Sequence, residues 1–172
     1  MIPARPENIP SSPDCRLLFV CMGNICRSPA AEAMMNHLAA ALPAARRPAC
    51  DSAGTLGYHA GSAPDRRMRE AARRRGITMT HKARQFVQAD FQNFDLILTM
   101  DDDNLEHVLA MAPDAASAAK VMPMTYFSSG NPLADHVPDP YYGGPEGFEH
   151  VLDILEDCCG NLLDKLIEGP QP

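Results

Sequence analysis

The chain has 172 residues, of which 45% are hydrophobic, and a formal net charge of −7. This length suits a single domain with a sizeable core, and the acidic balance argues against nucleic acid as a partner. No apolar run approaches the roughly 20 residues that a membrane-spanning helix needs, so we expect no membrane insertion.

Apolar runs alternate with helical patterns along the chain, which predicts an α/β domain built on a parallel sheet. In chain order, we expect strands over about 16–21, 49–53, 95–99 and 120–122. We expect helices over about 29–42, 65–75, 101–112 and 146–167. The predicted organisation is a disordered, proline-rich leader over 1–14, one domain over 15–168 and a flexible tail over 169–172.

Residues 20–29, which read VCMGNICRSP, carry the most informative motif. The motif places Cys21 at the end of the first strand and Arg27 six positions later, in a loop that leads into a helix. Such a loop directs backbone N–H groups inward and forms an anion-binding nest at the helix N-terminus. The residues expected to bind phosphate together with this cysteine and arginine are Met22, Gly23, Asn24, Ile25, Cys26 and Ser28.

The residue types of this loop also predict its local conformation. Gly23 and Asn24 can take the positive φ angles that a tight loop needs. Ser28 is expected to cap the following helix, with Pro29 at the first helical position.

The chemistry expected of the loop is covalent phosphoryl transfer. A helix N-terminus and a nearby guanidinium favour the thiolate form of Cys21, which would act as the nucleophile. Arg27 can hold two phosphate oxygens at once through its planar fork of donors. The Ser28 hydroxyl can donate a hydrogen bond to the sulfur and help it leave when the phosphocysteine breaks down.

The motif at 20–29, continued by the Ala-Glu-Ala of 31–33, resembles the low-molecular-weight protein tyrosine phosphatases. Further matches follow in the same order at 51–54, 57–58, 76–85, 90–91, 94–101 and 139–143, so the likeness extends over about 16–168. The resemblance implies a single-domain, flavodoxin-like fold with a four-stranded parallel sheet flanked by helices on both faces. It also implies hydrolysis of phosphotyrosine in proteins, and of small aryl phosphates, without a metal or other cofactor.

Asp139 is expected to act as the general acid. It lies between Pro138 and Pro140, whose fixed φ angles restrict the movement of its loop. A carboxyl group here can protonate the departing phenol and then activate the water that hydrolyses the phosphoenzyme. This acid follows the nucleophile in the sequence, an order that distinguishes the low-molecular-weight family from the other large groups of phosphatases with a Cys-x5-Arg loop.

The resemblance assigns supporting roles to further residues. It implies that Tyr58 and Tyr141 form aromatic walls of the cleft, with Tyr142 at its rim. It implies that Asp101 supports the loop and Arg27. The hydrogen-bond network that it implies around the loop consists of Asn24, Ser28, Ser52 and His81.

Two features have two interpretations each. Cys26 is either a small apolar residue at the base of the loop or, as the resemblance implies, a partner that forms a disulfide with Cys21 and protects it from irreversible oxidation. The arginines at positions 66, 67, 69, 73, 74 and 75 form either a solvated helix face or a surface that recruits acidic phosphopeptides.

Three functions compete with that of a tyrosine phosphatase. An arsenate reductase of similar fold would need later resolving cysteines, and none occurs between Cys50 and Cys158. A protein-arginine phosphatase usually has threonine at the position of Ile25 and a residue other than tyrosine at that of Tyr141. A non-catalytic module that binds oxyanions or senses redox state would be expected to lack part of the catalytic set.

The expected partners are phosphotyrosine-containing proteins, including, by analogy, a bacterial tyrosine kinase. Phosphate and other oxyanions are expected to inhibit. A thiolate nucleophile requires a reducing compartment, and the six cysteines fit no secreted disulfide framework, so we expect a cytoplasmic protein.

Overall fold

A four-stranded sheet of order β2-β1-β3-β4 forms the centre of the computed structural model, which describes residues 9–10, 14–130 and 133–168. Its strands are β1 (Arg16–Cys21), β2 (Ala49–Gly54), β3 (Leu96–Thr99) and β4 (Val121–Pro123). Every neighbouring pair is parallel, which confirms the predicted fold class. The expected tail over 169–172 and most of the expected leader over 1–14 lie outside the described residues.

Eight helical segments accompany the sheet in the described part of the chain. The longer ones are α1 (Arg27–Ala39), α2 (Arg66–Arg73), α4 (Asp102–Met111) and α6 (Pro145–Glu168). The short ones are α3 (Asp90–Asn93), α5 (Ala115–Ala118) and the 3-10 turns η1 (Ala44–Arg46) and η2 (Met124–Phe127). The sequence predicted the longer helices and missed the short ones, because a single turn carries no periodic pattern. None of the helices described here is long and apolar enough to cross a membrane.

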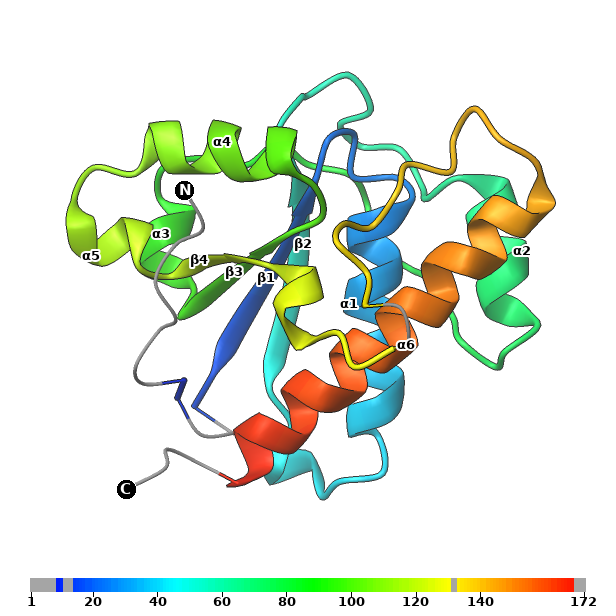
Figure 1. The fold of residues 1–172 in the computed structure, drawn as a ribbon, viewed down its shortest axis with the longest axis horizontal. Coiled ribbons are helices and arrows are strands. Elements are labelled where there is room, and N and C mark those ends of the chain that lie inside the picture. The colour runs from blue at the N-terminus through cyan, green and yellow to red at the C-terminus, as the bar shows by residue number, and fades with distance from the viewer. Residues whose placement is uncertain (1–8, 11–13, 131–132, 169–172) are drawn as a thin grey trace.

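Side chains of β1 alternate between the two faces of the sheet, as the pleat of a strand requires. Leu17 and Phe19 belong to a core shared with α1, α2 and α6, whereas Leu18 and Val20 belong to a second core shared with α3 and α4. Figure 1 shows α1 and α6 on one side of the sheet and α3 and α4 on the other. Because β1 lies between β2 and β3, its carboxyl end is the kind of position where open α/β sheets bind ligands.

The start of α1 differs from the prediction. The helix begins at Arg27, and the preceding Cys26 makes no side-chain capping bond. Ser28 is therefore not the cap, and Pro29 is the third helical residue, where its missing N–H still costs no intrahelical bond. The prediction failed because the Ser28 hydroxyl is used inside the loop instead of at the helix end.

Of the two loop residues that can take a positive φ angle, only one uses this freedom. Asn24 has a φ of +56°, but Gly23 does not adopt a positive φ. One left-handed residue is enough to turn this loop, and the side chain of Asn24, described below, holds it in that conformation.

Helix α2 ends as its residues predict. Asp65 caps its start by accepting hydrogen bonds from the N–H groups of Arg67 and Met68. Gly76 follows its end with a φ of +77°, a conformation that favours glycine after a helix.

Candidate active site

The Cys21 thiol lies at the carboxyl end of β1 and is held by the loop that follows it. Its Sγ accepts a hydrogen bond from the Asn24 backbone N–H at 3.3 Å and lies 3.0 Å from the Ser28 hydroxyl oxygen. A backbone N–H donor and a hydroxyl group thus meet one sulfur beside the N-terminus of α1, an environment that suits a sulfur anion. The structure places Cys21 where the sequence predicts, at the end of β1 and in the loop that follows it.

Arg27 is a buried charged residue near Cys21, with only 2% of its surface exposed. Its Nη1 donates to Asp101 Oδ2 at 2.6 Å and to the Val137 carbonyl at 3.1 Å, while Nη2 lies 3.7 Å from Asp139 Oδ2. Burial would lower the pKa of Arg27, but the charges of Cys21, Asp101 and Asp139 outweigh it and raise that pKa. The guanidinium is therefore permanently charged and fixed in orientation.

Asn24 holds the loop through its side chain, which is 1% exposed. Its Nδ2 donates to the Ser28 hydroxyl at 2.8 Å and to the Ser52 hydroxyl at 3.0 Å. Its Oδ1 accepts from the Arg84 backbone N–H at 2.9 Å and lies 2.8 Å from His81 Nε2. All four bonding positions that the amide offers in this geometry are occupied, which fixes its orientation.

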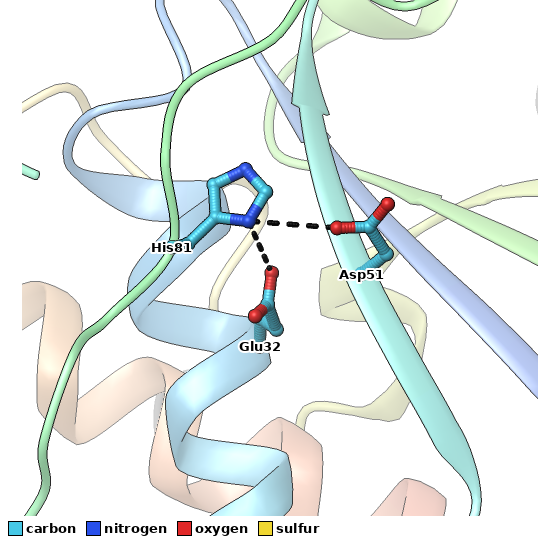
Figure 2. Close-up of side chains that lie close together, drawn as sticks. All are labelled: Glu32, Asp51 and His81. Atoms are coloured by element: carbon cyan, nitrogen blue, oxygen red, sulfur yellow. Dashed lines mark ion pairs between the residues drawn. The ribbon is translucent and has the colours of Figure 1, made fainter. Parts of the chain in front are cut away.

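His81 links this network to two carboxylates, as Figure 2 shows. Because Asn24 Oδ1 only accepts hydrogen bonds, His81 Nε2 must be the donor. The other ring nitrogen, Nδ1, lies 3.2 Å from Glu32 Oε1 and 3.5 Å from Asp51 Oδ1. One proton must lie between Nδ1 and these oxygens, since a bare nitrogen would repel both.

Glu32 and His81 are well placed to share that proton. Burial raises the pKa of Glu32 to about 7; the nearby Asp51 also raises it, while the hydrogen bond from Ser52 and the charge of Arg84 lower it. Burial likewise lowers the pKa of His81, an effect that Asp51 opposes and Arg84 reinforces. The two pKa values are therefore moved towards each other.

Glu32, Asp51 and His81 also have ligand atoms within 4.8 Å of one another, the spacing of a metal site. Each already has protein partners: Ser52 donates to Glu32, Arg84 pairs with Asp51, and His81 bonds Asn24. We assign the three side chains to support of the loop. Glu32 and Arg84 occur in segments that match the family, but no role for them could be predicted from the sequence; the only signal was a carboxylate in the helix turn next to the loop.

The loop forms one side of a cleft of about 130 Å³. The loop residues that line it are Cys21, Met22, Gly23, Ile25, Cys26 and Arg27. Asp139, Tyr141 and Tyr142 line the opposite side, and Asp139 Oδ1 accepts a hydrogen bond from the Tyr141 backbone N–H at 3.1 Å. The rings of Tyr141 and Tyr142 meet edge to face, with their centroids 4.9 Å apart.

Tyr58 is placed differently from the expectation. It is 87% exposed and is not among the residues that line the cleft. The next residue, His59, lines the cleft instead. The sequence analysis missed His59 because a shift of one position in a loop reverses which side chain faces inward, and no regular pattern fixes it.

Close backbone packing also shapes the loop from β2. A methyl group on Gly54, the last residue of that strand, would lie 2.6 Å from the Met22 carbonyl oxygen and 3.1 Å from the Asn24 nitrogen. Only glycine allows the phosphate loop to pass this close to the neighbouring strand.

Cys26 is a buried free thiol that lines the same cleft as Cys21. Burial raises the pKa of Cys26 strongly, and the charges of Asp65, Cys21 and Asp139 add to this effect. At neutral pH the Cys26 thiol therefore stays protonated.

Comparisons with known proteins agree with this geometry. The sequence model of the family described as low molecular weight phosphotyrosine protein phosphatase matches residues 16–171. A relative from Synechocystis, whose name describes a low molecular weight protein-tyrosine-phosphatase, is 51% identical over 152 residues, 88% of this chain and 96% of the relative.

Solved structures show the same similarity. A protein tyrosine phosphatase from Entamoeba histolytica is 46% identical with a TM-score of 0.85, over 90% of this chain and 98% of that chain. A Drosophila arginine phosphatase is 29% identical with a TM-score of 0.80, over 87% of this chain and 96% of that chain. Sequence, fold and relatives together show that this chain belongs to the low molecular weight protein tyrosine phosphatases.

Proposed function

We propose that this phosphatase hydrolyses phosphotyrosine in proteins through a phosphorylated Cys21. The observation that carries the proposal is the convergence of Cys21, Arg27 and Asp139 on one cleft, with Arg27 Nη2 only 3.7 Å from the Asp139 carboxylate. A nucleophile, a fixed cation and an acid within one small cleft are the parts that covalent phosphoryl transfer needs.

In the first step, the Cys21 sulfur attacks phosphorus, an S–P bond forms and the P–O bond to the tyrosine breaks. Asp139 gives its proton to the departing phenolate, which leaves as neutral tyrosine. Arg27 and the loop N–H groups stabilise the charge on the phosphate oxygens, because their positions are fixed before the reaction begins.

In the second step, water attacks the phosphocysteine and Asp139 takes a proton from that water. The S–P bond breaks and its electron pair returns to the Cys21 sulfur, while inorganic phosphate leaves. The Ser28 hydroxyl, 3.0 Å from the sulfur, donates a hydrogen bond to the anion that forms. Phosphate, as the product, is expected to compete with substrate for the loop.

Tyr141 supports an aromatic substrate. Its ring lines the cleft beside Asp139, where it can stack against a phosphotyrosine ring. The alternative substrate is phosphoarginine, on which the similar Drosophila protein acts by name. Ile25 and Tyr141 favour phosphotyrosine, as reasoned from the sequence.

The test compares wild type, Cys21→Ser and Asp139→Asn on an aryl phosphate and on phosphoarginine. We expect Cys21→Ser to be inactive and Asp139→Asn to lose about 10²- to 10⁴-fold in kcat on a substrate with a poor leaving group. Asp103→Asn, which removes an exposed carboxylate of α4, is the matched control. Full activity of Cys21→Ser would falsify the mechanism. A higher kcat/KM for phosphoarginine than for the aryl phosphate would instead identify the protein as an arginine phosphatase.

The proposed setting is a reducing cytoplasm, where the substrates are phosphotyrosine proteins and include an autophosphorylating tyrosine kinase. All six cysteines of the chain are free thiols in the structure, which supports such a compartment. Co-purification of the inactive Cys21→Ser variant with phosphotyrosine proteins from its own cell tests this setting.

A further inference from the structure

A second hollow of about 410 Å³ lies next to the catalytic cleft. Three arginines line it, Arg66 and Arg67 of α2 and Arg74 just after that helix, together with Glu70 and with Phe148 of α6. We call it the arginine groove. In Figure 1, α2 and the start of α6 lie side by side, with the segment that carries Asp139 arching above them.

The groove begins where the catalytic cleft ends. The Arg67 guanidinium lies 5.2 Å from the centroid of the Tyr141 ring and 4.8 Å from that of Phe148. Tyr141 lines the cleft and Phe148 lines the groove, so Arg67 stands between them. A chain that leaves the cleft past Tyr141 therefore meets the groove directly.

Within the described part of the chain, two of the three arginines of the groove form ion pairs, and one does not. Arg67 is paired with Asp65 at 3.0 Å and Arg74 with Glu149 at 3.2 Å. Arg66 is exposed and, among the residues that the structure describes, forms no close ion pair, although the charge of the nearby Glu70 acts on it. Its cation is available to a ligand.

The single acid that lines the groove does not cancel this charge. Glu70 is paired at 3.1 Å with Arg73, which lies outside the groove, and the charges of Arg74 and Arg66 act on it as well, so it stands as one acid against three lining arginines. The lining therefore presents a net positive charge on a protein whose formal net charge is −7. Such a local reversal of sign attracts anionic groups to one place on a surface that otherwise repels them.

We propose that the arginine groove binds an anionic side chain of the substrate that neighbours the phosphotyrosine in the cleft. The enzyme would then prefer phosphotyrosine in acidic sequences, through Arg66 first and Arg74 second. Carboxylates and a second phosphate share the required chemistry. This inference rests on the proposed function, because it names the class of phosphotyrosine protein on which the site acts.

The experiment measures kcat/KM for short phosphotyrosine peptides that differ at one position. A neutral parent peptide carries glutamine on both sides of the phosphotyrosine, and each member of the series replaces one glutamine by glutamate or by phosphoserine. We expect at least one position to raise kcat/KM by about three- to tenfold, as one or two exposed ion pairs allow. High salt should remove the gain.

Arg66→Gln should abolish most of this preference. Arg69→Gln removes the same charge from the same helix but outside the groove, where Arg69 donates to the Pro64 carbonyl and not to a groove acid, so it should keep the preference. Arg66→Glu should reverse the preference towards peptides with lysine at the sensitive position. Gains from glutamate and from phosphoserine show which anion the groove favours.

Equal kcat/KM for acidic and neutral peptides at every position, or equal effects of Arg66→Gln and Arg69→Gln, would overturn the inference. The neutral parent peptide separates this failure from failure of the proposed function. If the parent is hydrolysed in a Cys21-dependent manner, the proposed function stands and only the groove is refuted. If it is not hydrolysed, the proposed function itself fails.

Discussion

Replacement of Asn24 by alanine tests how the phosphate loop is held. The side chain is 1% exposed and bonds four groups: the hydroxyls of Ser28 and Ser52, His81 Nε2 and the Arg84 N–H. Its backbone has a φ of +56°, where alanine is strained. The substitution therefore removes both the network and the tolerance for this conformation.

The expected loss can be divided into two parts. A non-glycine residue without a local hydrogen bond costs about 1 kcal/mol in the left-handed region. Buried donors and acceptors that lose their partner cost roughly 1 to 3 kcal/mol each, and some of these groups will find water. We expect Asn24→Ala to lower the free energy of unfolding by about 3 to 5 kcal/mol, and Asn24→Gly by about 1 kcal/mol less.

Urea unfolding followed by far-UV circular dichroism measures both values, since the chain has no tryptophan for fluorescence. Asn36→Ala, at an exposed position of α1, is the control and should change the unfolding free energy by no more than about 0.5 kcal/mol. A loss below about 1 kcal/mol for Asn24→Ala, or a larger loss for the glycine variant, would refute the role given to Asn24.

Two further predictions concern protons and redox chemistry. The pKa of Glu32 rises from 4.5 to about 7 on folding, so its contribution to stability is fully present below pH 4.5 and is lost as the pH rises through 7. The difference in unfolding free energy between wild type and Glu32→Gln should therefore fall by about 3 kcal/mol from pH 4.5 to about pH 8, and a constant difference would contradict the assignment. Mild peroxide should oxidise Cys21 and Cys26 to a disulfide, and dithiothreitol should restore activity. In Cys26→Ala the same treatment should leave Cys21 irreversibly oxidised, so equal recovery in both proteins would exclude protection by Cys26.

Much of the fold follows from local pattern. The apolar run at 16–21 gives β1 with the predicted bounds, and the run at 96–99 is a fully buried strand. Gly76 ends α2 where the sequence places it, because the αL conformation after a helix favours this residue. The short segments α3 and α5 could not be predicted, since four residues carry no helical period.

Some residues of the site could also be predicted from local pattern, and others could not. Cys21 and Arg27 belong to one continuous motif, so their proximity could be predicted. The roles of Glu32 and Arg84 depend on contacts between α1, β2 and the 81–84 segment, which no local pattern encodes. Whether His59 or Tyr58 faces the cleft depends on the path of the loop that carries them, which no sequence pattern predicts.

The arginines at 66–75 show that the ion pairs made in the fold cannot be predicted from the sequence pattern. Their number suggested a solvated face, yet Arg75 makes ion pairs with Glu149, Asp153 and Glu156 of α6. Part of the cluster therefore joins α2 to α6, while Arg66 stays available. Only the arrangement in space separates these two uses of one residue type.

The most direct test of the catalytic account is to trap the intermediate. The enzyme is mixed with an aryl phosphate, quenched with acid within one turnover, digested and examined by mass spectrometry. The account predicts one phosphoryl group, attached to Cys21 and more abundant in Ser28→Ala, where the sulfur loses a donor that helps it leave. A phosphoryl group on any other residue, or none under conditions where product forms in a burst, would contradict it.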